Sequence, residues 1–193
     1  MASEFGLTQI GSPIDLFRIL DSVYLDQARL NFEKYVTETL AANASHGGRF
    51  SPRGEFGALY TSLEEVTAWA EVLHRFQSEG IDGLPPDMAI LRMAAQAGQY
   101  ADVADENGCD EWEVSLRDLT ADSPNEDQER ICLRLARAVR AVGDGLQCVS
   151  ARDQRINMPL FPDRAESELD LTLVASSKKA PPSGYAQRPL EQW

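Results

Sequence analysis

Strand-like and helix-like segments alternate irregularly along this chain, and their order constrains its fold more than any other feature. Residues 14–20 are apolar on both faces and follow a Gly-Ser-Pro turn, which indicates a short buried strand. Residues 22–41 instead place their apolar side chains at helical spacing. The segments that follow show no regular strand–helix–strand repeat, which favours the α+β class. We therefore predict the α+β class: a single domain with a mixed, mainly antiparallel β core flanked by helices.

Capping and turn signals predict further elements. Ser62 followed by Glu65 matches a capping box, which indicates a helix that starts at Ser62. The Ser-Pro-Asn-Glu sequence at 123–126 repeats this pattern, and Gly143 suits the end of the helix that it predicts. The other expected elements are a glycine-rich loop at 43–57, a helix around 88–99, and strands at 58–60, 146–150 and 169–174.

Charge is distributed very unevenly along the chain. The sequence has 31 acidic and 18 basic residues, for a formal net charge of −13. Residues 102–129 alone hold eleven acidic residues against one arginine, and we interpret this acidic segment as a solvated excursion from the fold. Repulsion from phosphates excludes nucleic-acid binding by the chain as a whole, whereas a small anion in a local basic pocket is compatible with these charges.

Length, cysteine spacing and the terminal sequences narrow the class of protein. A chain of 193 residues suits one domain, here residues 1–175, and residues 176–193 have the composition of a linker-like tail. Three cysteines without CxxC spacing predict no disulfide framework, and the histidines His46 and His74 lack metal-ligand spacing. No apolar stretch approaches the roughly 20 residues that cross a bilayer, and the N-terminus lacks the positive charge of a signal peptide. We therefore expect a cytoplasmic protein without a metal or a membrane partner.

Two arginines and a glutamate stand out as candidates for binding or catalysis. Arg49 lies in the glycine-rich loop, where backbone amides and a guanidinium can hold an anion; the alternative is a flexible surface loop. Arg18 lies inside an apolar strand and needs an anionic partner, either a structural carboxylate or a bound phosphate. Glu71 lies opposite the apolar stripe of its helix, where it either borders a ligand-binding cleft or forms a solvated ion pair with Arg75.

These candidates belong to a longer series of motifs. The motifs are Leu16-Phe17-Arg18-Ile19, Gly48-Arg49-Phe50-Ser51-Pro52, Leu59-Tyr60-Thr61-Ser62, Glu71 and Gly145-Leu146-Gln147-Cys148-Val149-Ser150. In their order and spacing they resemble the RES-domain toxins of bacterial toxin–antitoxin modules. That family is named for an arginine, a glutamate and a serine, which match Arg49, Glu71 and Ser150. The resemblance spans about residues 14–163 without the acidic segment, and Ser51 departs from the asparagine often found at its position.

The resemblance implies an ADP-ribosyltransferase-like fold, NAD+ as the substrate, and an antitoxin with a helix-turn-helix domain as the partner. It implies contacts from Arg18 and Arg49 to the pyrophosphate and stacking of the nicotinamide on Tyr60. Glu71 would then meet the ribose hydroxyl and the positive charge that develops on the ribose. Ser150 would orient either Glu71 or the nicotinamide amide. Because NAD+ carries a cationic leaving group, cleavage of its nicotinamide–ribose bond requires neither a metal nor a catalytic histidine.

Several alternatives stay open at this point. The acceptor of the ADP-ribose can be water, phosphate or a protein side chain, with a protein target in the last case. The chain can also be a non-catalytic interaction protein on the same fold, with the acidic segment as its docking surface. A homodimer is a further possibility, built on the helix face that carries Arg130, Arg134 and Arg137.

Overall fold

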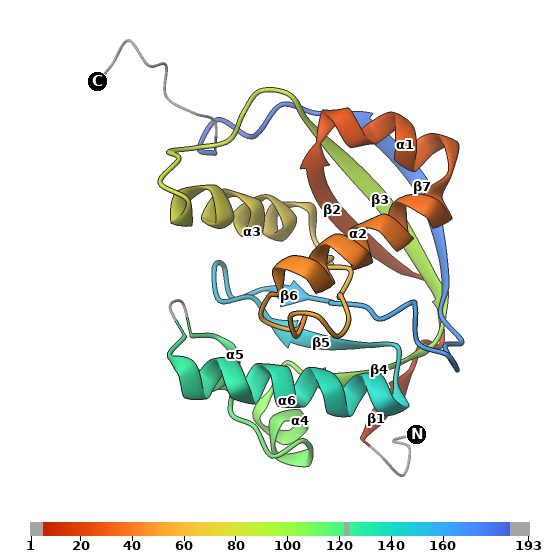
Figure 1. Cartoon of the computed structure of the whole chain (residues 1–193), viewed down its shortest axis with the longest axis vertical. Coiled ribbons are helices and arrows are strands. Elements are labelled where there is room, and N and C mark those ends of the chain that lie inside the picture. Colours follow the sequence, from red (N-terminus) through yellow and green to blue (C-terminus); the bar gives the residue numbers. More distant parts are fainter. Residues whose placement is uncertain (1–5, 122–123, 186–193) are drawn as a thin grey trace.

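Two small β-sheets, joined where strand β3 runs into strand β4, form the core of the computed structural model, which describes residues 6–121 and 124–185 (Figure 1). One sheet has the strand order β2-β3-β7 and the other β1-β4-β5-β6, and every pair is antiparallel except β4–β5. The strands are β1 (Leu7–Gln9), β2 (Ile14–Asp21), β3 (Met88–Ala97), β4 (Gln99–Val103), β5 (Gly145–Val149), β6 (Ile156–Asn157) and β7 (Asp170–Lys178). The predicted α+β class, with a mixed, mainly antiparallel core flanked by helices, is confirmed.

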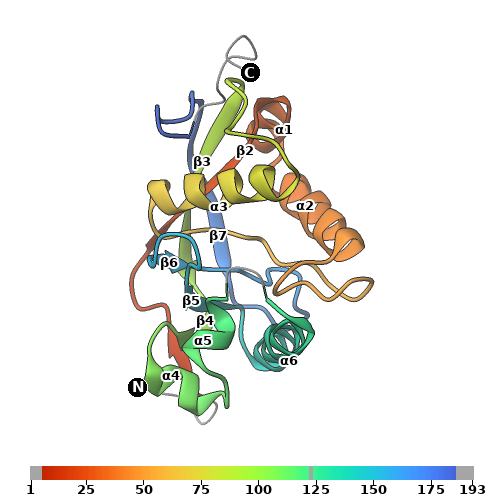
Figure 2. The same ribbon diagram turned by 90° about the vertical axis from the view of Figure 1, so that its left-hand side faces the viewer.

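The sheet β2-β3-β7 buries side chains on both of its faces. Leu16 and Leu20 of β2 pack with α1 (Leu25–Leu30) and α2 (Phe32–His46), which lie to the right of β3 and β7 in Figure 2. Ile19 belongs instead to a cluster around Trp69 of helix α3 (Glu65–Ser78). Successive side chains of a strand point to opposite faces, so this alternation places α3 against the other face of the sheet.

Residues 88–99 form a strand and the start of the next one, and the predicted helix is wrong. β3 is the central strand of its sheet, and residues 88–91 and 93–95 are buried. Its alanines favour a helix when the segment is considered alone. Small and apolar side chains equally suit a strand that is covered on both faces, and the neighbouring strands β2 and β7 satisfy its backbone groups.

Residues 22–41, whose apolar side chains keep helical spacing, form two helices, and the second of them continues to His46. A 3-10 turn at Ser22–Tyr24 leads into α1, and α2 starts after Asn31. Asn31 has φ −153°, and its side-chain oxygen accepts a hydrogen bond of 2.9 Å from the backbone N–H of Lys34. This cap ends one helix and begins the next while the apolar spacing continues across the break.

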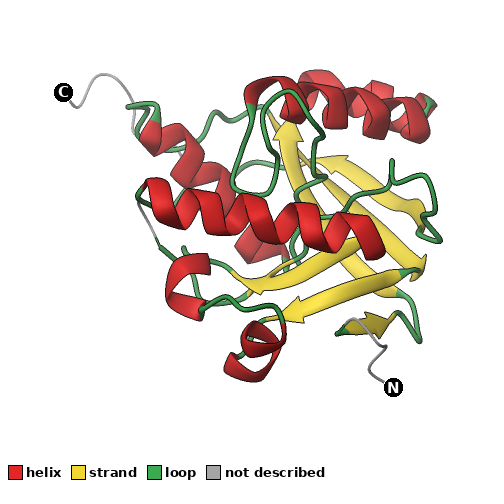
Figure 3. Ribbon diagram, turned by 60° about the horizontal axis from the view of Figure 1, so that its bottom comes forward, coloured by secondary structure: helices red, strands yellow, loops and turns green. Residues whose placement is uncertain are grey.

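Helix α6 (Glu126–Val142) covers the second sheet (Figure 3). Its buried residues pack against β4 and β5; they are Cys132, Leu135, Ala136 and Val139. Asn125 is the N-cap and forms a capping box with Gln128, whereas the predicted cap Ser123 lies outside the described residues. Gly143 follows the last residue of the helix, as predicted.

Two other local predictions are wrong. The N-cap of α3 is Glu64, and Ser62 instead donates a hydrogen bond of 2.7 Å to the side chain of Asn157. Residues 58–60 form a single bridge, between Leu59 and Leu160, and not a strand. Both corrections have one physical cause, because this part of the chain pairs with a distant segment: Ser62 with Asn157 and Leu59 with Leu160.

The acidic segment is packed on the fold and is not merely a solvated excursion. It contains α4 (Glu106–Glu111), α5 (Leu116–Leu119) and the start of α6. Cys109 and Leu119 are fully buried in the core beneath α6, while the acidic side chains of α4 are exposed. Its helices therefore cover the second sheet with apolar side chains and turn their charges outward.

The predicted boundary at residue 175 falls inside β7, which runs to Lys178 and pairs with β3. Beyond it, the backbone carbonyl of Tyr185 accepts a hydrogen bond of 2.7 Å from the N–H of Leu84. Residues 176–185 therefore pack on the domain. The last part of the predicted tail, residues 186–193, lies outside the described residues.

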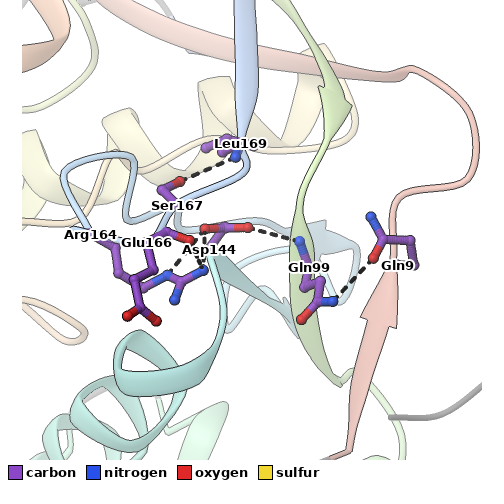
Figure 4. A network of polar contacts seen from close by, with 7 residues as sticks. All are labelled: Gln9, Gln99, Asp144, Arg164, Glu166, Ser167 and Leu169. Carbon is purple, nitrogen blue, oxygen red and sulfur yellow. Dashed lines mark hydrogen bonds and ion pairs between the residues drawn. The ribbon is translucent and has the colours of Figure 1, made fainter.

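A buried ion pair ties three segments of the chain together (Figure 4). Asp144 is 1% exposed, and Arg164 donates to its Oδ1 from Nε at 3.2 Å and from Nη2 at 3.1 Å. The other carboxylate oxygen accepts a hydrogen bond of 2.9 Å from the backbone N–H of Gln99. The pair thus joins the start of β4, the residue before β5 and the segment that leads into β7.

The three cysteines are buried, and this predicts how stability changes at alkaline pH. Burial raises the pKa of Cys132 from about 9 to about 11, and burial also raises the pKa of Cys148. The unfolded chain loses these protons first, so the thiols stabilise the fold fully below about pH 9, and this contribution disappears as the pH rises through 11. We expect the urea midpoint to fall between pH 9 and 11 and to fall less in a Cys132→Ser variant. An equal fall of the midpoint in both proteins would show that the thiol of Cys132 does not cause this loss of stability.

Among the described residues, no helix is long and apolar enough to cross a membrane.

Candidate functional site

The carboxylate of Glu71 is held by two side chains from a different part of the chain. Glu71 lies on α3 and is half-buried. Its Oε1 accepts a hydrogen bond of 2.7 Å from Ser150 Oγ and one of 2.6 Å from Asn157 Nδ2. The structure therefore brings together two of the residues singled out in the sequence, Glu71 and Ser150.

The ion pair between Glu71 and Arg75, considered as the alternative, is not formed. Arg75 pairs with Glu79, with 3.6 Å between Nε and Oε1, and both side chains are largely exposed. Glu71 faces the β5–β6 hairpin, so it belongs to a half-buried polar site and not to the solvated side of the helix.

A short turn of the β5–β6 hairpin sets the positions of Ser150 and Asn157. Ser150 and Arg155 close the turn with a backbone hydrogen bond of 2.6 Å, and Gln154 takes a left-handed conformation with φ 62°. Two contacts dock the turn on α3: Thr67 Oγ1 donates to Asp153 at 2.8 Å, and Arg155 donates to Glu64 at 3.0 Å. The hairpin thus carries its two donors to the face of α3 on which Glu71 lies.

Arg152 and His74 complete the charged surroundings of Glu71. The backbone N–H of Arg152 donates to Ser150 Oγ at 3.0 Å. Burial lowers the pKa of Arg152, with Glu71 acting against this effect and Arg49 adding to it. Burial, followed by the charge of Arg152, lowers the pKa of His74, which favours the neutral imidazole. Arg49, Glu71, His74 and Arg152 therefore share one electrostatic environment.

Sequence reasoning missed three members of this site. His74 carried a usable signal, because it lies three residues after Glu71 and so on the same helix face. Arg152, two residues after Ser150, carried a weaker one. Asn157 carried none, since only the hairpin brings it to Glu71.

Arg49 is held by main-chain oxygens at the end of α5. Nη1 donates to the carbonyl of Leu119 at 2.8 Å, and Nη2 donates to the carbonyl of Ala121 at 2.5 Å. The loop that carries Arg49 is also ordered by Tyr60, whose hydroxyl contacts Phe50 N at 3.1 Å and Ser51 Oγ at 3.0 Å. The loop is therefore a fixed element of the fold, and the alternative of a flexible surface loop is wrong.

Arg18 is bound by neutral oxygens, and the anionic partner expected for it is not among its contacts in the described part of the chain. Its Nε donates to the hydroxyl of Tyr35 at 3.0 Å, and its Nη1 donates to the carbonyl of Tyr60 at 2.7 Å. Burial raises the pKa of Tyr60, so its hydroxyl stays protonated at neutral pH. Tyr60 thereby links the segments that carry Arg18 and Arg49.

Replacement of Arg49 by alanine is expected to lower the free energy of unfolding by about 1–3 kcal/mol, because two carbonyls lose their donors. Arg49→Lys should recover only part of this loss, since an ammonium cannot reproduce the fork. Arg53→Ala is the matched control, because exposed Arg53 donates from the same loop to a single carbonyl, that of Ser45. Urea denaturation measures all three, and equal stabilities for the Arg49→Ala and Arg53→Ala variants would show that Arg49 does not anchor this loop.

Comparison with known proteins places this arrangement in a family. The model of the RES domain matches residues 16–179, which include most of the buried core and every residue of the site. The chain therefore belongs to the RES-domain family.

A solved structure shares the fold at low sequence identity. It is a chain of the crystal structure of the M. tuberculosis MbcT–MbcA toxin–antitoxin complex, with a TM-score of 0.66 and 13% identity. The match covers 90% of the present chain and 87% of that chain. No curated protein matches the sequence.

Proposed function

We propose that this protein is an NAD+-consuming enzyme that cleaves the nicotinamide–ribose bond and acts as the toxin of a type II toxin–antitoxin system in the cytoplasm. The observation that carries the proposal is the oriented carboxylate of Glu71, which Ser150 and Asn157 hold close to the charge of Arg152. Membership of the RES-domain family and the likeness to a chain of a toxin–antitoxin complex support it.

The chemistry requires little beyond positioning and charge. As the bond between the ribose C1′ and the nicotinamide nitrogen breaks, its electron pair neutralises the pyridinium, so the leaving group needs no proton. Positive charge develops on the ribose, where the Glu71 carboxylate stabilises it. The acceptor oxygen or nitrogen then bonds to C1′; water or a neutral side chain gives up a proton in this step, whereas an anionic phosphate oxygen has none to lose. Water, phosphate and a protein side chain all satisfy this balance, and transfer to a protein would make the enzyme a mono-ADP-ribosyltransferase.

The substrate carries negative charge on its pyrophosphate, and the site has arginines to meet it. We assign Arg18 and Arg49 to the pyrophosphate, as the family resemblance implies, and Arg152 adds a third positive charge beside Glu71. Tyr60 is assigned to the nicotinamide ring. Ser150 is assigned the orientation of Glu71, a role that its 2.7 Å hydrogen bond supports.

Incubation with labelled NAD+, with and without a cell lysate, tests the proposal. Free ADP-ribose or its phosphate among the products indicates degradation of NAD+, and label on one protein band indicates transfer to a protein. If NAD+ remains intact under all of these conditions, and cellular NAD+ does not fall on expression, the proposed function is wrong.

A second candidate function is a non-catalytic interaction protein on the same fold. The observation that favours it is that Arg18 and Arg49 already bind neutral oxygens of the chain itself, as structural arginines do. The acidic segment would then be the docking surface. Calorimetry separates the two functions, because an interaction protein of this kind would show no NAD+ binding that depends on Arg49.

An antitoxin partner is expected to compete with NAD+ for this site. The arginines favour an acidic group or a C-terminal carboxylate in the inhibiting segment. The acidic segment at 102–129 would separately steer a basic partner surface, an effect that salt screens. Higher ionic strength should therefore slow association more than it speeds dissociation, as measured by surface plasmon resonance. A ternary complex of toxin, antitoxin and NAD+ in native mass spectrometry would instead indicate inhibition at a distance.

A further inference from the structure

We propose that Ser62 and Asn157 are positioning residues of the reaction, which together hold Glu71 so that its Oε2 is the oxygen that meets the substrate. The inference rests on the proposed function and deepens it, since it assigns roles to two residues and to one atom of the Glu71 carboxylate.

Ser62, Asn157 and Glu71 form a hydrogen-bond chain, and the donor and acceptor of each bond follow from the chemistry of the side chains. Ser62 Oγ donates to Asn157 Oδ1 at 2.7 Å, so the carbonyl side of the amide is occupied. The NH2 side then faces Glu71, where Nδ2 donates to Oε1 at 2.6 Å. A carboxylate can only accept, and the hydroxyl of Ser62 supplies the hydrogen that an amide oxygen requires. The carboxylate of Glu71 therefore selects the orientation of the Asn157 amide, and the hydroxyl of Ser62 stabilises that orientation by donating to Oδ1.

Ser150 approaches the same oxygen with an equally defined direction. Its hydroxyl oxygen accepts from the backbone N–H of Arg152 at 3.0 Å, so its hydrogen is directed to Glu71 Oε1 at 2.7 Å. Two donors thus converge on Oε1, and Oε2 takes part in neither bond. This asymmetry orients the carboxylate about its last torsion and leaves Oε2 for the ribose.

Backbone pairing holds Ser62 and Asn157 in place before a substrate binds. Ser62 is 3% exposed and forms an isolated bridge with Asn157, flanked by hydrogen bonds from Met158 N to Thr61 O at 2.8 Å and from Leu63 N to Ile156 O at 3.0 Å. A second bridge connects Ser62 to Phe17 of β2. The two side chains are therefore fixed by the main chain, so the carboxylate is preorganised.

Kinetics of single and double variants test this role. Asn157→Ala and Ser62→Ala should lower kcat by about 10- to 100-fold and change KM little, because the carboxylate is misplaced while the NAD+ contacts remain. Ser62→Thr keeps the hydroxyl and should recover most of the activity. In a Glu71→Gln background, Asn157→Ala should cause no further loss. A full additional loss in that background, or a change confined to KM, would overturn the proposal.

A second measurement does not depend on activity and separates this inference from the proposed function. In ¹⁵N–¹H spectra, the side-chain amide signals of Asn157 should shift in both Glu71→Gln and Ser62→Ala and stay in place in Glu79→Gln. Unchanged signals in the first two variants would overturn the hydrogen-bond chain. Shifted signals in a protein that consumes no NAD+ would instead show that the hydrogen-bond chain is formed and that the proposed function is wrong.

Discussion

Glu71→Gln is expected to lower the turnover of NAD+ by about 10²–10³-fold while the protein stays folded. The variant keeps the size of the side chain and removes the negative charge that opposes the developing positive charge on the ribose. The bonds from Ser150 and Asn157 to Oε1 can both persist, because the glutamine amide retains one carbonyl oxygen. Turnover is measured by product analysis with saturating NAD+, and folding by circular dichroism.

Glu79→Gln provides the matched control at the end of the same helix. Glu79 is the C-cap of α3, and its exposed ion pair with Arg75 contributes at most about 1 kcal/mol to stability. Its replacement should leave turnover unchanged. If Glu71→Gln also kept full activity, Glu71 would have no part in the chemistry.

Asp144→Ala is expected to have the largest effect on stability, a loss of about 3–5 kcal/mol in the free energy of unfolding. The side chain of Arg164 is only 12% exposed, so the variant leaves a largely buried positive charge without its partner. It also removes the acceptor of the backbone N–H of Gln99, at the start of β4. Urea denaturation at neutral pH measures the loss.

Asp15→Ala tests whether burial is the cause of this effect. Asp15 forms a bidentate ion pair with Arg92, with hydrogen bonds of 3.1 and 2.6 Å, but the two side chains are 46% and 48% exposed. We expect a much smaller loss for this variant, because solvent screens the exposed ion pair. Equal losses for Asp15→Ala and Asp144→Ala would show that the fold does not depend on the buried pair.

Local sequence patterns predicted those elements that an apolar pattern or a capping residue marks within the segment itself. The apolar run at 14–20 is β2, the segment 146–150 overlaps β5, and Gly143 ends the helix that covers the second sheet. The position of Glu71 opposite the apolar stripe of α3 likewise indicated a polar site. These signals are short-range, because side-chain spacing depends only on the local backbone period.

The alanine-rich segment at 88–99 shows where such reasoning fails. Its composition suits a helix and a fully buried strand equally, and the choice depends on whether neighbouring strands are present to pair with it. Asn31 shows the converse, since one capping side chain interrupts an apolar pattern that continues on both sides.

The sequence by itself determined the α+β class, the family resemblance and the identity of Arg49, Glu71 and Ser150 as candidate residues. Only the tertiary structure decided which side-chain and main-chain groups hold them. Asn157 lies 86 residues from Glu71, and Arg49 reaches carbonyls 70 and 72 residues away. The physical reason is that spacing along the chain reports which face of an element is buried, whereas a hydrogen-bond partner is set by how distant elements pair. The site therefore exists only once the β5–β6 hairpin has docked on α3.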